Sequence, residues 1–292
     1  MKYSESLCEI FQPDATTRLA SHIWLPEGKP RAIFIAVHGG MAYAGDWMET
    51  ALYFKTKGIA TYAPDLRWHG DFPNHNPGEK NFFHIDSYDT YVRDIDLYCR
   101  DIKRKHPGVP VFILSHSNGA LISLCYGLKY GRNAGLAGMI MSSPWLVNRV
   151  KVPRVMKAAA RIIAMIYPRF EVTPKPVTDH LTHDAGITAR HHADEISGVR
   201  GTTASAGLAV ASEKAQQFVL DTMASWDAAP ILGIIAGQDM LADPQPSESA
   251  LKSVTNQDVD VLYYHANFHE NFNEVNREEI WERTWDWVRD KL

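Results

Sequence analysis

Six apolar runs without polar alternation constrain the fold of this 292-residue chain more than any other feature. They are "AIFIAV" (32–37), "GIATYAP" (58–64), "VPVFIL" (109–114), "LAGMIMSS" (136–143), "PILGIIAG" (230–237) and "VDVLYY" (259–264). An unbroken apolar run of this length is typical of a strand buried on both faces. Helix-length segments at 47–57, 88–105 and 119–130 separate most of the runs. The sequence therefore predicts an α/β fold with a mostly parallel central sheet and helices on both faces.

The two ends of the chain carry packing signals rather than chemistry. Near the start, "SLCEIF" and "RLASHIWL" flank the turn-forming "QPDATT", a pattern that predicts an antiparallel hairpin. Near the end, "EEIWERTWDWVRDKL" places Trp281, Trp285 and Val288 at helical spacing. We interpret these residues as core packing and assign them no catalytic role.

Residues 148–228 interrupt the alternation, because a connection this long far exceeds the few residues usual between a strand and the next helix. We predict a helical cap inserted into a core made of 1–147 and 229–292. Within it, "VPRVMKAAARIIAMIYP" gathers an apolar helix face that includes Ile162 and Ile166. Two interpretations stay open: a helix packed onto the main sheet, or a lid over an apolar pocket.

Charge and composition exclude several classes of protein. The net charge is −4 and the basic residues are scattered, so no nucleic-acid-binding surface is indicated. No apolar run is long enough to span a membrane, and "MKYSESLCEIFQPD" lacks the pattern of a signal peptide. We therefore expect a cytoplasmic protein. A basic amphipathic surface for lipid has one modest candidate, "RVKVPRVMK".

No cofactor or metal is expected from the motifs. Patterns for nucleotide binding, GxGxxG and GxxxxGK[ST], are absent. The three cysteines are too few and too dispersed for a disulfide framework or a CxxC zinc site. His191 and His192 are adjacent, so their side chains point apart, and no HExxH spacing accompanies them.

Ser117 is the candidate nucleophile. It lies in "FILSHSNGAL" (112–121), between a predicted buried strand and a predicted helix rich in small residues. That context is the one a nucleophile elbow requires, although the usual GxSxG pattern is here SxSxG, with Ser115 at the first glycine position. Taken alone, the stretch leaves a polar turn as the alternative.

A serine nucleophile needs a base and an orienting acid further along the chain. Asp239 follows the predicted strand at 230–237 directly, with Asp243 as its competitor or as the cap of a following helix. His265 and His269 both lie after the strand at 259–264. Position favours Asp239 and His269 in the order Ser, Asp, His.

Two backbone N–H groups would form the oxyanion hole. One belongs to Asn118, the residue after the candidate nucleophile. The other is expected from Gly40, in the "VHGG" turn that follows an early strand, where glycine lets a substrate approach the backbone closely. The alternative is a simple glycine-rich turn.

With these residues in place, the sequence resembles the monoacylglycerol lipase and lysophospholipase group of α/β-hydrolases, also described as serine aminopeptidase-like. "VHGG" is similar to the HG oxyanion motif of the group, "YAPDLRWHGDF" to its DxRGHG loop, "SSPWL" to the strand end before the cap, and "HLTHD" to a marker within the cap. "YHANFHENFNE" matches its HExxNE segment closely. The stretch 87–120 is similar to the one that leads into its elbow.

The resemblance implies a catalytic triad of Ser117, Asp239 and His269, with Gly40 and Asn118 as oxyanion donors. It favours His269 over His265 and Asp239 over Asp243. Three features depart from the pattern of the group: Ser115 in the elbow, Trp68 in the DxRGHG loop, and "GMAYAGDW" where the lipases carry a GEHSGRY-like segment. The last departure adjoins the oxyanion hole and bears on glyceride specificity.

The expected activity is hydrolysis of small-molecule carboxylic esters, such as monoacylglycerols, lysophospholipids or aryl esters. Ile162, Ile166 and Trp145 are expected to bind the substrate, and the cap is expected to allow transient contact with lipid surfaces. The same scaffold and triad also serve peptidases, thioesterases and carbon–carbon bond hydrolases. A non-catalytic ligand-binding relative is the alternative from another class, and the complete ordered set of Ser, Asp and His argues against it.

Overall fold

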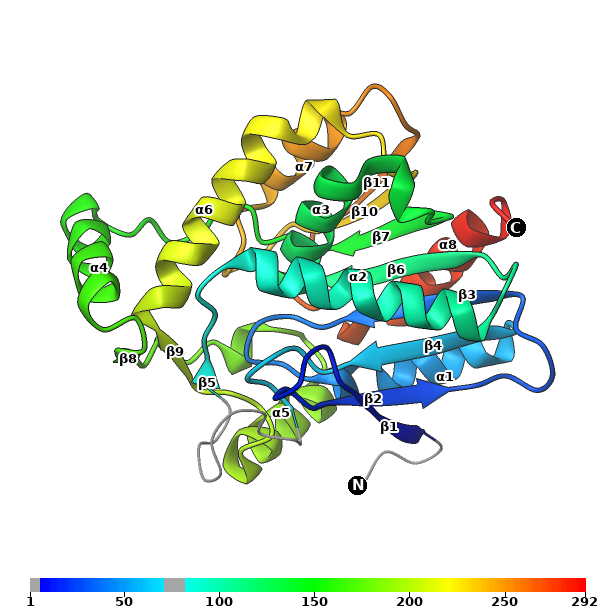
Figure 1. Cartoon of the computed structure of the whole chain (residues 1–292), viewed down its shortest axis with the longest axis horizontal. Helices are drawn as coiled ribbons and strands as arrows, with labels where there is room; N and C mark the ends of the chain where they lie inside the picture. The colour runs from blue at the N-terminus through cyan, green and yellow to red at the C-terminus, as the bar shows by residue number, and fades with distance from the viewer. Residues whose placement is uncertain (1–5, 71–81) are drawn as a thin grey trace.

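An eight-stranded sheet forms the centre of the computed structural model, which describes residues 6–70 and 82–292 (Figure 1). Its strands run in the order β1-β2-β4-β3-β6-β7-β10-β11. Their bounds are β1 (Leu7–Phe11), β2 (Leu19–Trp24), β3 (Ala32–Val37), β4 (Ile59–Pro64), β6 (Val111–His116), β7 (Gly138–Ser142), β10 (Ile231–Ala236) and β11 (Val259–Tyr264). The pairs β1–β2 and β2–β4 are antiparallel and the other pairs are parallel. The predicted hairpin and the predicted parallel sheet are both present.

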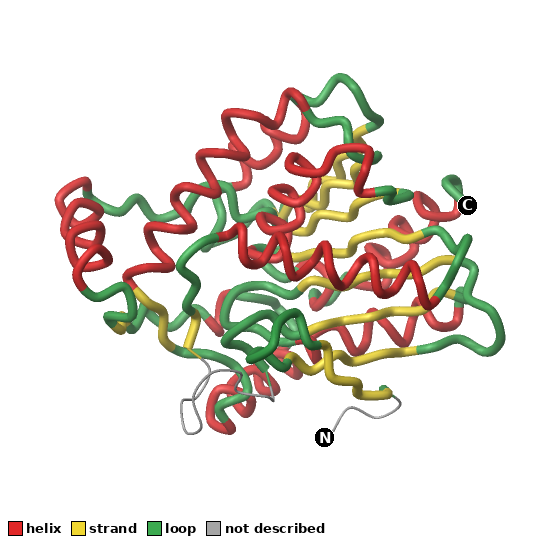
Figure 2. The backbone as a smooth tube through the Cα atoms, in the orientation of Figure 1, coloured by secondary structure: helices red, strands yellow, loops and turns green. Residues whose placement is uncertain are grey.

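Helices cover both faces of this sheet (Figure 2). One face packs against α1 (Met48–Thr56) and α8 (Arg277–Arg289). The other packs against α2 (Tyr88–Lys105), α3 (Asn118–Tyr130), α6 (Ala206–Thr222) and α7 (Pro244–Lys252). The predicted core residues Trp281, Trp285 and Val288 are buried on α8. Short 3₁₀ helices complete the loops: η1 (Ala44–Trp47), η2 (Gly131–Ala134), η3 (Thr178–His180), η4 (Met223–Ser225) and η5 (Asn271–Asn273).

The long connection between β7 and β10 carries α4 (Arg154–Ile166), β8 (Glu171–Val172), α5 (Ala185–Ser197), β9 (Thr203–Ser205) and α6. A small second sheet joins β8 and β9 to β5 (Phe82–Phe83) in the order β5-β9-β8. Helix α6 contributes Leu208 and Val219 to the main apolar core. It therefore serves as the helix that returns the chain to the central sheet, and the more peripheral elements before it are the ones that would act as a cap.

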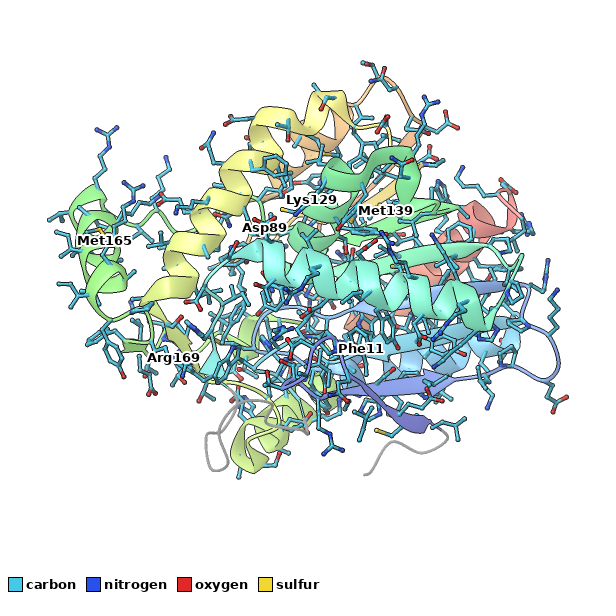
Figure 3. The ribbon with its side chains drawn as sticks, in the orientation of Figure 1. Phe11, Asp89, Lys129, Met139, Met165 and Arg169 are labelled. Carbon is cyan, nitrogen blue, oxygen red and sulfur yellow. The ribbon has the colours of Figure 1, made fainter. Side chains whose placement is uncertain are left out.

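Helix α4 stands away from the sheet at the left of Figure 1 and buries none of its residues. The interpretation of this segment as a helix packed onto the main sheet is therefore wrong. Its neighbour is α6, to which Lys157 and Arg161 are tied by ion pairs with Glu213 of 2.9 and 2.8 Å. Met165, labelled in Figure 3, is 82% exposed. The apolar face predicted for this helix thus reaches solvent. Within the described residues, no helix combines the length and apolar character that crossing a bilayer requires.

Candidate active site

Ser117 occupies the sharp turn between β6 and α3. Its backbone has φ 53° and ψ −116°, a strained conformation for a residue with a side chain. The turn is tight because α3 runs directly against the end of β3: a Cβ atom on Gly119 would lie 2.3 Å from the carbonyl oxygen of Val37. The strand, turn and helix predicted around Ser117 are thus present, and the start of α3 directs its first N–H groups toward this turn.

Ser115 fits the elbow because its side chain points toward β7, which supplies acceptors for its hydroxyl. The residue is fully buried, and the single proton of its Oγ has two acceptors within reach, the carbonyl oxygen of Ile140 at 3.2 Å and Sδ of Met141 at 3.1 Å. A buried hydroxyl with partners carries little energetic penalty. The departure from the glycine pattern is therefore accommodated by polar contacts with the neighbouring strand.

Asp239 and His269 are joined by a hydrogen bond of 2.6 Å from Nδ1 of the imidazole to Oδ2 of the carboxylate. Oδ1 of Asp239 accepts from the backbone N–H groups of Leu241 and Ala242 at 2.8 and 2.9 Å. Burial alone would raise the pKa of Asp239, but His269 and these donors outweigh it and lower that pKa. Burial alone would lower the pKa of His269, yet the adjacent carboxylate leaves that pKa above its ordinary value.

The two competitors for these positions have other surroundings. Asp243 is the N-cap of α7, and its carboxylate accepts from the N–H of Gln245 at 3.4 Å. His265 is exposed directly after β11. The contact of Asp243 and the exposed position of His265 both lie apart from the hydrogen bond between Asp239 and His269.

The loop that carries His269 is held by two residues that the sequence reasoning did not single out. Oγ of Ser143 donates to the carbonyl oxygen of His269 at 2.7 Å. Nδ2 of Asn271 contacts Oγ of Ser143 at 3.0 Å and the carbonyl oxygen of Ile234 at 3.3 Å. Asn271 thus ties the histidine loop to the ends of β7 and β10. No signal in the sequence marks Asn271, because it occupies an unspecified position of the HExxNE motif.

The loop after β3 is fixed by two buried histidines. Nε2 of His38 accepts from the N–H of Leu66 at 2.9 Å, and Nε2 of His69 accepts from the N–H of Met41 at 3.1 Å. Burial lowers the pKa of His38 and of His69 to about 3, so both rings are neutral and able to accept at neutral pH. The ring of Phe83 packs against Gly40, where a Cβ atom would lie 2.3 Å from it.

A pocket of about 320 Å³, part of it open to solvent, adjoins these groups. Its lining includes Gly39 of the loop after β3 (residues 38–41, the candidate oxyanion loop), His116 next to Ser117, and Glu270 next to His269. The rings of His116 and His269 meet edge to face at 4.6 Å. The pocket therefore adjoins the loop after β3 and the chain neighbours of Ser117 and His269, while the three candidate triad residues are not part of its lining.

The three predicted substrate-binding residues differ in position. The backbone N–H of Trp145 donates to the carbonyl oxygen of Ser117 at 3.3 Å, which places Trp145 beside the elbow. Ile162 and Ile166 lie on α4 and are 58% and 80% exposed. These two side chains do not line the pocket described above.

A model of the family described as serine aminopeptidase, S33, matches residues 28–276. The chain belongs to this family. The resemblance inferred from the motifs and the predicted α/β-hydrolase fold are thereby confirmed. The matched range contains all five residues expected in the triad and the oxyanion hole.

The chain is similar to a monoacylglycerol lipase of Mycolicibacterium smegmatis, with 26% identity over 94% of each chain. It is 37% identical to a monoglyceride lipase homologue of monkeypox virus over 51% of each chain. The crystal structure of a monoacylglycerol lipase from Paleococcus ferrophilus superposes with a TM-score of 0.79 at 20% identity, covering 94% of this chain and 99% of the other. A carboxyl esterase from Bacillus coagulans gives 0.81 at 19% identity and covers 98% of both. The expectation of a carboxylic ester hydrolase agrees with these names.

Trp68 is the clearest departure from the family pattern, and the structure gives it contacts of its own. Its backbone φ is 67°, a region that favours glycine. The guanidinium of Arg169 lies 5.0 Å from the centre of the Trp68 ring, and the ring of His84 meets it at 5.5 Å. Trp68 therefore contacts the long connection between β7 and β10 through Arg169, a contact that glycine has no side chain to make. Asp71 and Phe72 of the same motif lie outside the described residues.

The marker "HLTHD" and the histidine segment contact each other. Nδ1 of His183 lies 2.9 Å from Oε1 of Glu274, and the N–H of Phe268 donates to the same carboxylate at 2.8 Å. Oγ1 of Thr182 donates to the carbonyl oxygen of Asn273 at 2.7 Å. Two motifs that are about 85 residues apart are thus one structural unit beneath the site.

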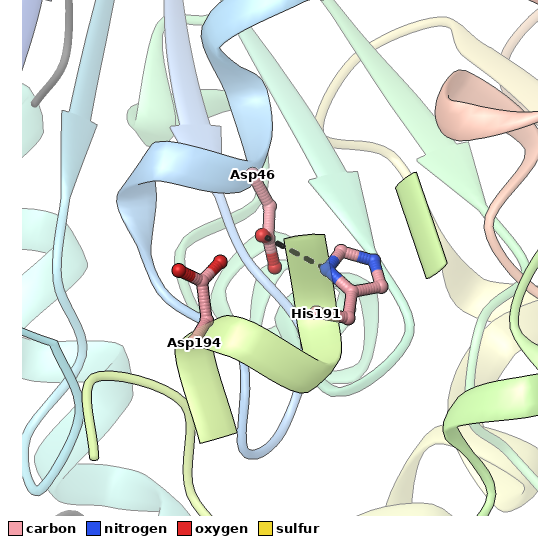
Figure 4. Close-up of side chains that lie close together, drawn as sticks. All are labelled: Asp46, His191 and Asp194. Atoms are coloured by element: carbon pink, nitrogen blue, oxygen red, sulfur yellow. Dashed lines mark ion pairs between the residues drawn. The ribbon is translucent and has the colours of Figure 1, made fainter. Parts of the chain in front are cut away.

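One group of described side chains has the composition of a metal site. Asp46, His191 and Asp194 each offer a ligand atom within 4.8 Å of the others (Figure 4). Arg200 already donates to Asp46, however, at 3.2 Å, and Tyr43 donates to Asp194 at 2.9 Å. Because a guanidinium supplies the positive charge in this group, we assign it no metal.

Proposed function

We propose that this protein hydrolyses carboxylic esters with a lipid-like or aryl acyl part through an acyl-enzyme on Ser117. The observation that carries the proposal is the 2.6 Å hydrogen bond between His269 and Asp239, whose loops follow neighbouring parallel strands. Ser117 sits on a strained elbow, and the ring of its neighbour His116 meets the ring of His269 at 4.6 Å. Acyl transfer to a hydroxyl requires a nucleophilic serine and a base that is oriented by a carboxylate.

In this mechanism Nε2 of His269 takes the proton of Ser117 as its Oγ attacks the ester carbonyl. The tetrahedral oxyanion accepts hydrogen bonds from the N–H groups of Gly40 and Asn118. His269 then protonates the departing alcohol, which leaves the acyl group on Ser117. Water repeats these steps, so the acid is released and Ser117 regains its proton. Asp239 holds the imidazole tautomer throughout and stabilises its charged form.

The acyl part is proposed to meet the cap within 148–228. Trp145 lies beside the elbow, and α4 offers Ile162 and Ile166 as an exposed apolar surface. An exposed apolar helix face suits a long acyl chain or the surface of a lipid aggregate. The names of the relatives, monoacylglycerol lipase and monoglyceride lipase homologue, favour glycerol monoesters as the first substrates to test.

A peptidase is the second candidate, because the family description names an aminopeptidase. Amide hydrolysis would use the same three residues. It differs in the leaving group, which is an amine that His269 must protonate before it can depart.

A substrate panel separates these candidates. Para-nitrophenyl esters of increasing chain length, a monoacylglycerol, a lysophospholipid and an aminoacyl amide would each be assayed with the wild type and with Ser117→Ala. Ser123→Ala, a buried serine on the same helix, is the matched control. We expect ester hydrolysis by the wild type and the control alone. Turnover of the amide with no turnover of esters would contradict the proposal.

A further inference from the structure

A buried charged cluster lies next to the candidate catalytic histidine and joins it to the cap. The cluster consists of Asp46 on η1, His191 on α5, Arg200 after α5, and Glu270, which follows His269 in the chain. The side chains of Arg200 and His191 are 4% and 0% exposed. Charges this far from water persist only when they are paired.

Glu270 is held entirely by its neighbours. Oε1 accepts from Arg200 at 3.0 Å, and Oε2 accepts from Nε2 of His191 and from Nδ2 of Asn273, both at 2.8 Å. Its backbone N–H donates to the carbonyl oxygen of Leu181 at 2.8 Å. Three of these four partners belong to the cap segment, so the orientation of Glu270 depends on where the cap lies.

Arg200 connects Glu270 to the other side of the site. Its guanidinium also donates to Oδ2 of Asp46 at 3.2 Å. Asp46 lies on η1, the short helix that directly follows the candidate oxyanion loop. Gly201, which follows Arg200 in the chain, donates its N–H to the carbonyl oxygen of Met41 at 2.8 Å. Oδ1 of Asp46 also lies 3.8 Å from Nδ1 of His191, the ion pair that the dashed line marks in Figure 4. One short segment of the cap thus contacts both the histidine loop and the oxyanion loop.

We propose that Arg200 is a positioning residue, which holds Glu270 against Asp46 and thereby fixes the histidine loop and the oxyanion loop relative to each other. A buried ion pair is weak evidence for stability, because the cost of removing both charges from water offsets their attraction. We expect this ion pair to contribute by fixing the positions of the two loops. A catalytic group must stay close to its productive position, and a distant change that shifts it slows the reaction. The proposal rests on the proposed function for its kinetic readout only.

The charge of Arg200 also bears on His269. Asp239 and His116 contact the His269 ring, and the adjacent Glu270 acts on it through its charge. The negative charge of Glu270 favours the protonated imidazole, and Arg200 balances that charge. Removing Arg200 alone should therefore raise the pKa of His269, whereas neutralising Glu270 should lower it. These opposite shifts show that the ion pair acts electrostatically on His269, and the loss of kcat reports its positioning role.

The test is a double-mutant cycle with Arg200→Met, Glu270→Gln and the combined variant. We expect Arg200→Met to lower kcat on a soluble short-chain ester by about 10- to 100-fold with little change in KM. The acid limb of its kcat/KM profile should move to higher pH, and that of Glu270→Gln to lower pH. The combined variant should be several-fold more active than the product of the single effects, because it leaves no unpaired Glu270 charge. Arg200→Lys should restore the pH profile but not the full kcat.

Two control variants distinguish the loss of the positioning role of Arg200 from general damage to the fold. Arg132→Met removes an exposed arginine far from the cluster, and His192→Gln removes the exposed neighbour of His191; both should behave as the wild type. Strictly additive losses, or acid limbs that coincide in all variants, would overturn the proposal. NMR titration of the His269 imidazole needs no turnover, so it tests the opposite pKa shifts even if the wild type proves inactive on esters. Failure of the proposed function and failure of this inference are therefore distinguishable.

Discussion

His269 and Asp239 lie 30 residues apart in the chain, and the 2.6 Å hydrogen bond between Nδ1 and Oδ2 brings them together at the ends of adjacent strands. A carboxylate can only accept, so Nδ1 carries the proton and Nε2 is left as the basic atom. This tautomer is the one that a general base toward Ser117 needs. The pair therefore leads directly to a pH prediction.

Activity should fall on the acid side as His269 becomes protonated. The adjacent Asp239 carboxylate raises the pKa of His269, so the acid limb of kcat/KM should lie above the ordinary histidine value of about 6.5. Asp239→Asn should lower kcat by roughly 10³- to 10⁴-fold, because the amide cannot hold the same tautomer or stabilise the imidazolium. Asp243→Asn is the matched control and should keep the profile. An Asp239→Asn variant with near-normal kcat would exclude Asp239 from the triad.

Gly119 should tolerate no side chain. A Cβ atom there would lie 2.3 Å from the carbonyl oxygen of Val37 and 2.4 Å from that of His38, and both are backbone atoms that cannot move aside cheaply. We expect Gly119→Ala to lower the free energy of unfolding by roughly 3 kcal/mol. Gly186→Ala is the control, since its nearest contact is a side chain at 3.2 Å. Equal melting curves for the two variants would show that the elbow is looser than described.

Ser115 should matter for stability more than for catalysis. Ser115→Gly restores the usual elbow pattern but removes the hydrogen bond to Ile140 and adds backbone freedom to β6. We expect the free energy of unfolding to drop by about 1 to 2 kcal/mol, with kcat within a few-fold of the wild type. Chemical denaturation and ester assays on the same preparation measure both quantities. A large loss of kcat with unchanged stability would instead assign Ser115 a role in catalysis.

Ile162 tests the role proposed for α4. Because this side chain is 58% exposed, Ile162→Asp should not disturb folding. It should impair hydrolysis of long-chain esters more than that of acetate esters, since only a long acyl chain would reach the helix. Ile196→Asp, at an exposed position on α5, provides the control. Equal losses on short and long esters would count against an acyl-binding role for α4.

The sheet and the candidate triad could be predicted from the sequence because both leave local signals. Buried parallel strands read as apolar runs, and the strand, turn and helix around Ser117 read as an elbow. The order of strands then places Asp239 and His269 at one edge. The position of α4 could not be decided, because a helix packed on a sheet and a helix exposed as a lid show the same periodicity.

The charged cluster around Arg200 left no such signal. Asp46, His191, Arg200 and Glu270 come from three separated segments, and each alone is typical of a solvated surface. Only the folded arrangement shows that His191, Arg200 and Glu270 are buried together, with the half-buried Asp46 beside them. The role of Trp68 left no signal either, since its contact with Arg169 depends on the path of the long connection between β7 and β10.

The most direct test of the central claim is labelling by a fluorophosphonate, which reacts with serines that are activated as nucleophiles. The wild type would be incubated with the probe, digested and analysed by mass spectrometry. We predict one adduct, on Ser117, with no labelling of Ser117→Ala and slower labelling at pH values where His269 is protonated. An unlabelled wild type that is folded, or an adduct on another serine, would contradict the assignment of Ser117 as the nucleophile.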